Sequence, residues 1–301
     1  MVPPTVQLVR MRSLSHGNAV FWAAFSNDGK KLATASLDNT VKMWNVSDGQ
    51  HVGTLKGHGD GVAFVGYLAD GRIVTASLDR TLKLWAADAT TPTTTFTGHQ
   101  GDYLACATIS RNGTLIASGG FDKTVRLWDA QSGGALATLS GHTATVQAVA
   151  ISSNDRIVAS GSDDRSIRLW DVPTKQLLRT LTGHELTVES LVFAAKDELL
   201  VSGSSDGTIR FWNLDGTPLA KLDANCGRVK CLTFSPDGEL LATGGGDGTV
   251  RLWSVADRRG LSATPAHQNT VYCVAFNPAG NLLASAGFDR SIHLWDVRRD
   301  G

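Results

Sequence analysis

Several features that would assign a function at once are missing from this 301-residue sequence. No apolar run approaches the 18 or more residues that a membrane-spanning helix needs, and the first residues contain no apolar signal core with a cleavage site. The 28 basic and 28 acidic residues cancel, so there is no basic excess with which to grip nucleic acid or an anionic membrane. These absences argue against both as partners. They make the cytoplasm the expected location, with the nucleus as the alternative.

Cysteine is scarce, and its placement argues against metal and disulfide chemistry. Cys106, Cys226, Cys231 and Cys273 form no C-x-x-C pair, so a structural zinc site is not expected. Three of the four stand in apolar segments typical of strands, which favours buried, reduced thiols. The sequence also lacks a G-x-x-x-x-G-K-[ST] phosphate loop and an H-E-x-x-H zinc motif. No cofactor, metal or small-molecule substrate is therefore expected.

What the sequence does contain is an internal repeat, marked by tryptophan. The marking residues are Trp44, Trp85, Trp128, Trp170, Trp212, Trp253 and Trp295, separated by 41, 43, 42, 42, 41 and 42 residues. An aspartate lies six residues before each tryptophan, and a serine or threonine lies four residues before each aspartate. About 22 residues before the aspartate stands a histidine, except in the sixth repeat, which has Asn225.

The local signals within each repeat are those of β structure. Short apolar runs such as VQAVAIS (146–152) and SIRLWDV (166–172) alternate with turn clusters such as NDG (27–29) and PDG (236–238). No segment has a helical period of useful length. Four short strands in a period of about 42 residues fit one blade of a β-propeller. The sequence predicts an all-β, seven-bladed β-propeller of four-stranded antiparallel blades.

Over nearly its whole length the repeat resembles that of the WD-repeat (Trp-Asp repeat) family. The Gly-His pairs of that family stand at 57–58, 98–99, 141–142 and 183–184, and its Trp-Asp pairs at 128–129, 170–171 and 295–296. The other four tryptophans are followed by Asn45, Ala86, Asn213 and Ser254, and the outer histidines His16 and His267 lack the preceding glycine. The resemblance implies the same propeller fold.

The closure of the ring is also implied. The six residues DVRRDG follow Trp295, so the last repeat lacks its outer strand, whereas Thr5–Arg12 (TVQLVRMR) is a strand candidate without a repeat of its own. In the WD-repeat family the N-terminal strand completes the last blade, which removes an exposed sheet edge. We therefore expect one propeller domain over residues 5–301 and a tail at 1–4.

The recurring serine, histidine and aspartate raise the question of a hydrolase triad. The fourth and fifth repeats contain His142, Ser160, Asp164 and Trp170, and His184, Ser202, Asp206 and Trp212. An enzyme needs its catalytic group once, whereas a pattern present in every repeat is a rule of construction. The resemblance implies that each set forms a buried hydrogen-bonded chain, in which the histidine bridges the carboxylate and the hydroxyl and the indole N–H finds an acceptor. The chain is therefore not expected to be an enzyme.

Positions that differ between repeats are free to face a partner. In the WD-repeat family three positions per blade point to the narrower face around the central channel: the third and fifth residues after the histidine, and the residue before the aspartate. Counted in this way, blades seven, one, two and three contribute an apolar arc of Tyr272, Phe288, Phe21, Leu37, Leu78, Leu104 and Phe121. Blades four and five contribute Asp163 and Glu189, and blade six contributes Arg228 and Lys230. Because exposed apolar and aromatic patches mark interaction sites, we expect the arc to bind a peptide or helix of a partner protein.

Other functions find weaker support. A histone-tail or modified-lysine reader needs an aromatic cage, but Phe21 and Tyr272 fall on adjacent blades rather than across the channel. The channel-mouth positions contain no cluster of titratable groups for an enzyme. His51 and His293 stand outside the repeat pattern and are expected to be solvated surface groups. The sequence favours a non-catalytic scaffold or complex subunit, with the reader as the alternative and the regulatory domain of a larger enzyme behind it.

Removal of one repeat histidine tests the buried chain. His142→Ala would leave the carboxylate and hydroxyl partners without a hydrogen bond, and a buried unsatisfied group costs roughly 1–3 kcal/mol. We expect the melting temperature of this variant to fall, as followed by circular dichroism. An unchanged melting temperature would count against the buried network. The sixth repeat, with Asn225, should have the weakest network of all.

Overall fold

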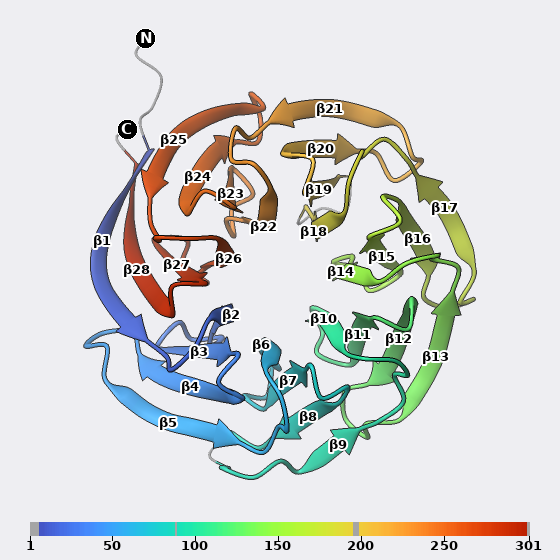
Figure 1. Ribbon diagram of the computed structural model, residues 1–301, viewed down its shortest axis with the longest axis horizontal. Helices are drawn as coiled ribbons and strands as arrows, with labels where there is room; N and C mark the ends of the chain where they lie inside the picture. Colours follow the sequence, from blue (N-terminus) through green and yellow to red (C-terminus); the bar gives the residue numbers. More distant parts are fainter. Residues whose placement is uncertain (1–5, 88, 195–198, 300–301) are drawn as a thin grey trace.

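Each repeat forms a four-stranded antiparallel sheet, and the seven sheets stand around a central cavity lined by their inner strands (Figure 1). The computed structural model describes residues 6–87, 89–194 and 199–299. The predicted seven-bladed β-propeller is confirmed. The expected tail at 1–4 and residues 5 and 300–301 of the expected domain lie outside the described residues. Within the described ranges, no helix is long and apolar enough to cross a membrane.

In blades one to six the strands run from the channel outward in chain order, and in blade seven β1 follows β28 as the outermost strand (Figure 1). Blades one and two consist of β2 (Val20–Phe25), β3 (Lys31–Ser36), β4 (Thr40–Asn45) and β5 (His51–Lys56), then β6 (Val62–Tyr67), β7 (Ile73–Ser77), β8 (Leu82–Trp85) and β9 (Thr94–Phe96). Blades three and four consist of β10 (Leu104–Ile109), β11 (Leu115–Gly120), β12 (Thr124–Asp129) and β13 (Ala135–Ser140), then β14 (Val146–Ile151), β15 (Ile157–Ser162), β16 (Ile167–Asp171) and β17 (Leu177–Leu181). Blades five and six consist of β18 (Val188–Phe193), β19 (Leu200–Ser204), β20 (Thr208–Trp212) and β21 (Pro218–Asp223), then β22 (Val229–Phe234), β23 (Leu240–Gly245), β24 (Thr249–Ser254) and β25 (Arg259–Pro265). Blade seven consists of β26 (Val271–Phe276), β27 (Leu282–Gly287), β28 (Ser291–Arg299) and β1 (Val6–Ser15).

The second strand of each blade is the most buried, because the neighbouring blades pack against both of its faces. All residues of β11, β19 and β23 are buried, whereas the outer strand β17 has four exposed residues in five. Such close packing requires small residues in the second strand. A Cβ atom on Gly203 of β19 would lie 2.6 Å from Val229, which begins the inner strand of the next blade. Glycine at this position therefore sets how closely blades five and six approach.

The N-terminal strand closes the ring, as expected. β1 pairs antiparallel with β28 from Val6↔Arg299 to Ser15↔Ser291, so it continues three residues beyond the predicted end at Arg12. In Figure 1 it forms the outermost strand of blade seven, beside the C-terminal strand. The side chains of Val6 and Leu8 are buried in a cluster that also contains residues of blade six. β1 therefore seals blade seven and its boundary with blade six.

Two residues of β1 allow the seal to be measured. Leu8 is 9% exposed in the cluster, whereas Met11 on the same strand is 53% exposed. Leu8→Ala should lower the free energy of unfolding by about 2–4 kcal/mol, because a buried leucine leaves a cavity when it is truncated. Met11→Ala, the matched control, should change it by about 0.5 kcal/mol or less. Chemical denaturation measures both, and equal losses would show that β1 does not seal the ring through its buried side chains.

Candidate functional site

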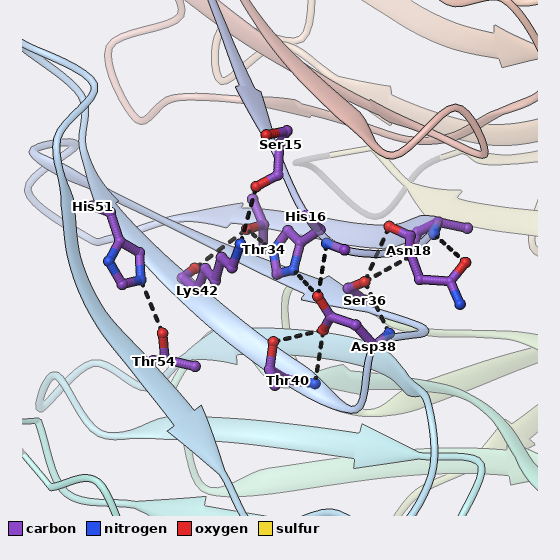
Figure 2. Close-up of polar contacts among 12 residues, drawn as sticks. Ser15, His16, Asn18, Thr34, Ser36, Asp38, Thr40, Lys42, His51 and Thr54 are labelled. Carbon is purple, nitrogen blue, oxygen red and sulfur yellow. Dashed lines mark hydrogen bonds and ion pairs between the residues drawn. The ribbon is translucent and has the colours of Figure 1, made fainter.

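A chain of hydrogen bonds ties the segment before the first strand of blade one to its second and third strands (Figure 2). Nδ1 of His16 lies 3.0 Å from Oδ2 of Asp38, and Nε2 lies 2.8 Å from Oγ1 of Thr34. The indole N–H of Trp44 donates to the same hydroxyl at 2.8 Å. Because an ionised carboxylate can only accept, Nδ1 carries the imidazole proton and the threonine hydroxyl donates to Nε2. Every member of the chain is therefore satisfied.

The same chain recurs in blades two, three, four, five and seven. In blade four His142 bridges Asp164 and Ser160 at 2.8 Å each, and Trp170 donates to Ser160 at 2.8 Å. In blade five His184 bridges Asp206 at 2.8 Å and Ser202 at 2.7 Å, and Trp212 donates to Ser202 at 2.8 Å. The structure thus brings together the residues that the repeat pattern singled out.

The electrostatics of this chain suit a structural role. Burial lowers the pKa of His142, and the hydrogen bond that its ring donates to Asp164 offsets this only in part, so the ring is neutral near pH 7. Burial opposes ionisation of Asp164, but hydrogen bonds from Ser166, Thr143 and His142 outweigh it and lower the pKa of Asp164 to about 2. The Ser160 hydroxyl is wholly buried, with the ring and the indole N–H on either side. It therefore has no path to a substrate.

Blade six departs from the pattern. Asn225 is exposed and has a positive φ of 48°, so its side chain does not take the place of the histidine. Asp247 instead pairs with the guanidinium of Arg251 at 2.7 Å, while Trp253 still donates to Thr243 at 2.9 Å. Among the described residues no side chain links Asp247 to Thr243. Blade six thus has the smallest network, as the missing histidine predicts.

The expectation that His293 is solvated is wrong. His293 is 7% exposed and stacks on His267, with 4.7 Å between the ring centroids. Its Nδ1 lies 2.9 Å from the hydroxyl of Ser13 on β1, and its Nε2 lies 3.2 Å from the hydroxyl of Ser291. His51, by contrast, is exposed and lies 2.9 Å from the hydroxyl of Thr54 (Figure 2).

The closing strand explains the burial of His293. In blades one, three and five a lysine or arginine two residues before the tryptophan places its charge over the indole ring, as Lys42 does at 5.7 Å from Trp44. In blade seven Arg10 of β1 takes this place, 5.8 Å from the ring of Trp295. The cation therefore comes from the other end of the chain, and β1 covers the histidine.

The same corner contains a group of side chains with metal-binding atoms. Ligand atoms of His267, Asp289 and His293 lie within 4.8 Å of one another. The hydroxyl oxygen of Ser291 stands between them, 2.9 Å from His267, 2.6 Å from Asp289 and 3.2 Å from His293. Zinc would need about 2.0–2.2 Å to each atom. The space fits a hydrogen-bonded hydroxyl rather than a metal ion.

The narrow face is the face that carries the seven Asp-containing turns. There the backbone N–H of Leu37 donates to the carbonyl of Ala19 at 2.9 Å, which places the residue before the aspartate beside the start of the inner strand. A cavity of about 200 Å³ opens at the channel mouth on this face. This channel-mouth pocket is lined by Phe21, Trp22, Ala63, Phe64, Leu78, Tyr103, Ala105, Cys106, Ala107, Gln147, Glu189, Lys230 and Tyr272.

Most of the expected apolar arc does lie on this face. Phe288 and Phe121 are 49% and 41% exposed, whereas Phe21, Leu37, Leu78 and Tyr272 are half-buried. The ring of Tyr272 contacts that of Phe21, with 4.9 Å between centroids, and that of Phe288, with 6.2 Å. Blades seven and one therefore present three touching rings.

The placement of Leu104 in the arc is wrong. Leu104 is wholly buried, because it begins the inner strand β10 and occupies the position of Val20 and Val62 in blades one and two. Blade three has one more residue between its histidine and its inner strand than the other blades. Ala105 takes the position of Phe21 instead, and Tyr103 takes that of Ala19, with its ring 5.4 Å from that of Phe121. The His99–Asp122 spacing of 23, against 22 in most blades, was the signal for this insertion.

The charged residues of blades four to six pair with their neighbours. Asp163 accepts hydrogen bonds from Gln147 at 3.3 Å and from Thr187 of the next blade at 3.0 Å. Arg228 donates to the hydroxyl of Thr270 in blade seven at 3.1 Å. The acidic and basic sectors expected from the sequence therefore form hydrogen bonds across the blade boundaries.

Glu189 and Lys230 make the strongest of these contacts. Glu189 accepts a hydrogen bond from Ser205 at 2.6 Å and forms an ion pair with the ammonium of Lys230. The side chain of Glu189 is 8% exposed and that of Lys230 is 23% exposed. The same ammonium lies 5.7 Å from the centroid of Tyr272. Lys230 thus links the polar sector to the aromatic one.

Two family models match this chain. The model described as the IFT122 first beta-propeller matches residues 104–264, and the model of the WD domain, G-beta repeat, matches residues 9–45, 49–86 and 260–296. The chain is 42% identical to a WD repeat-containing protein WDS homolog of Arabidopsis thaliana over 69 residues, 22% of this chain and 12% of that protein. It is 39% identical to human WD repeat-containing protein 86 over 49 residues (16% and 13%) and 47% identical to the human Denticleless protein homolog over 45 residues (15% and 6%). The matches span a small part of each relative.

Acid should weaken blade seven through His293. Burial, with the neighbouring His267 and Arg10, lowers the pKa of His293 from 6.5 to about 4. Between these values the unfolded chain binds more protons than the folded protein, so the free energy of unfolding falls as the pH drops from about 6.5 towards 4. His293→Asn retains a group that can bond Ser13 but cannot titrate. Its loss of stability between pH 7 and pH 5 should be about 1–2 kcal/mol smaller than that of the wild type.

Urea denaturation at a series of pH values measures this difference. The groups facing His293 are Arg10 and Ser13 on β1 and His267, Asp289 and Ser291 in blade seven. His51→Asn, on an exposed strand, is the matched control and should follow the wild type. Parallel pH profiles of the free energy of unfolding for His293→Asn and the wild type would contradict the attribution of the acid effect to His293.

Proposed function

Since this chain belongs to the WD-repeat family of β-propellers, we propose that it is a non-catalytic scaffold or complex subunit that binds a peptide or helix of a partner protein on its narrow face. The observation that carries the proposal is the exposure of Phe121 and Phe288. They are the only exposed phenylalanine, tyrosine or tryptophan side chains among the described residues, and both lie on this face. Aromatic side chains are the commonest anchors of protein interfaces.

The arrangement around these rings also supports binding. Tyr103 lies against Phe121, and Tyr272 lies against Phe288, so each exposed ring has an aromatic neighbour that holds it in place. Rings fixed before binding lose little side-chain entropy when a partner docks. The paired charges of blades four to six border this aromatic surface, in keeping with the polar rim of a protein interface.

The alternative of a modified-lysine reader finds less support. A reader holds the ligand cation against aromatic faces. Here Phe21 and Tyr272 pack edge to face, with 74° between their planes, and the ammonium of Lys230 already lies over Tyr272. The regulatory domain of a larger enzyme remains the weaker alternative, and it would use the same surface to bind.

Capture experiments with two matched variants test the proposal. Phe121→Ser/Phe288→Ser removes both exposed rings, and Leu136→Ser/Leu177→Ser removes two leucines that are 50% and 42% exposed on the outer strands β13 and β17. Each immobilised variant, first shown by thermal melting to be folded, is exposed to lysate of the source cells. Quantitative mass spectrometry compares the proteins retained.

We expect at least one protein to be held by the wild type and by the leucine variant but lost by the phenylalanine variant. The affinity for that protein, measured with purified components, should fall about tenfold or more, because hot-spot rings contribute about 1–2 kcal/mol or more each. A partner retained by the phenylalanine variant and lost by the leucine variant would move the binding surface to the outer strands.

A further inference from the structure

We propose that the channel-mouth pocket receives one uncharged, apolar side chain of the partner, and that Lys230 excludes a cationic one. The proposal rests on the proposed function, because it assumes that the partner docks on the narrow face. It adds the chemistry of the anchoring side chain and names the residue that determines it.

The size of the pocket limits what it can hold. Its volume is about 200 Å³, and cofactors and drug-sized ligands occupy sites of about 300–1,000 Å³. The walls are mainly apolar, with Phe21, Leu78, Tyr103 and Tyr272 among the lining residues. A space of this size and lining fits a single aromatic or aliphatic side chain.

The charges in the pocket decide against a cation. Glu189 is the only carboxylate among the described residues of the lining, and it is already paired with Lys230 and hydrogen-bonded to Ser205. The ammonium of Lys230 also lies over the ring of Tyr272. The protein's own cation therefore already takes the two groups, a carboxylate and an aromatic ring, that could bind a cation of the partner. A lysine or arginine entering here would meet a like charge in a partly desolvated site, where repulsion is stronger than in water.

An uncharged side chain meets no such obstacle. The ion pair can stay intact while an apolar group covers it and excludes water from the rings. Lys230 therefore acts on specificity through repulsion of the wrong ligand as well as by ordering Tyr272.

Side-chain analogues provide a direct test. The uncharged probes are indole and 4-methylphenol, and the cationic probes are n-butylammonium and n-butylguanidinium. Binding is followed by NMR through the methyl groups of Leu78, Ala63 and Ala105, which line the pocket. In the wild type the uncharged probes should shift these methyl signals saturably. The cationic probes should bind with an affinity lower by about tenfold or more.

Two variants test the role of Lys230. Lys230→Met frees Glu189 and the face of Tyr272, so n-butylguanidinium should bind about tenfold or more tightly than to the wild type. Lys230→Met/Glu189→Gln removes both charges and avoids an unpaired buried carboxylate, so it is the safer variant if the single one fails to fold. The double variant should bind indole with the same affinity as the wild type does. It should still bind n-butylguanidinium more weakly than indole.

Three results would overturn the proposal. The first is binding of n-butylguanidinium to the wild-type pocket as tightly as indole, and the second is a double variant that prefers the cation. The third is a set of methyl signals that indole and 4-methylphenol leave unshifted, which would reject the pocket as an anchor site. If Phe121→Ser/Phe288→Ser still lost its partner in that case, the scaffold function would stand and only the pocket would fail.

Discussion

The structure depends on one buried hydroxyl per blade, which bonds two rings at once in every blade except the sixth. A serine or threonine hydroxyl can donate one hydrogen bond and accept others, so in blade four Ser160 donates to His142 and accepts from Trp170. This hydroxyl joins the segment before the first strand to the second and third strands. The histidine then fixes the aspartate and its turn. Because that turn forms the narrow face, the internal network also positions the residues proposed to bind a partner.

Blade seven shows that the network can be completed from the far end of the chain. β1 contributes Arg10 over Trp295 and Ser13 beside His293, so the closing strand adds polar contacts as well as apolar packing. Blades one, three and five obtain the corresponding cation from their own third strand, as Lys42 illustrates. The strand that closes the ring is therefore a member of the hydrogen-bond and cation–ring network of the last blade, in addition to packing on it.

The fold could be predicted from the sequence because its signal is repeated, so a departure in one repeat does not obscure the others. The site could be predicted only in part. Counting residues from His99 assumed a loop of constant length, and one extra residue shifted the count, so buried Leu104 was named in place of Ala105 and half-buried Tyr103 was missed. The burial of His293 depends on a strand nearly 280 residues away in the sequence, and the pairing of Glu189 with Lys230 depends on how two blades meet. Neither is a property of one repeat.

The pairing of Ser15 with Ser291 has a consequence for how a ribosome makes this protein. Elongation proceeds at roughly 5–20 residues per second, so on the order of 15–60 s separate the emergence of β1 from that of its partner strand. Throughout this time the nascent chain carries an unpaired strand and an incomplete ring. A second nascent chain on the same messenger could offer β1 a competing edge. The order of synthesis thus makes the emergence of β28 the step that lets β1 close the ring within its own chain.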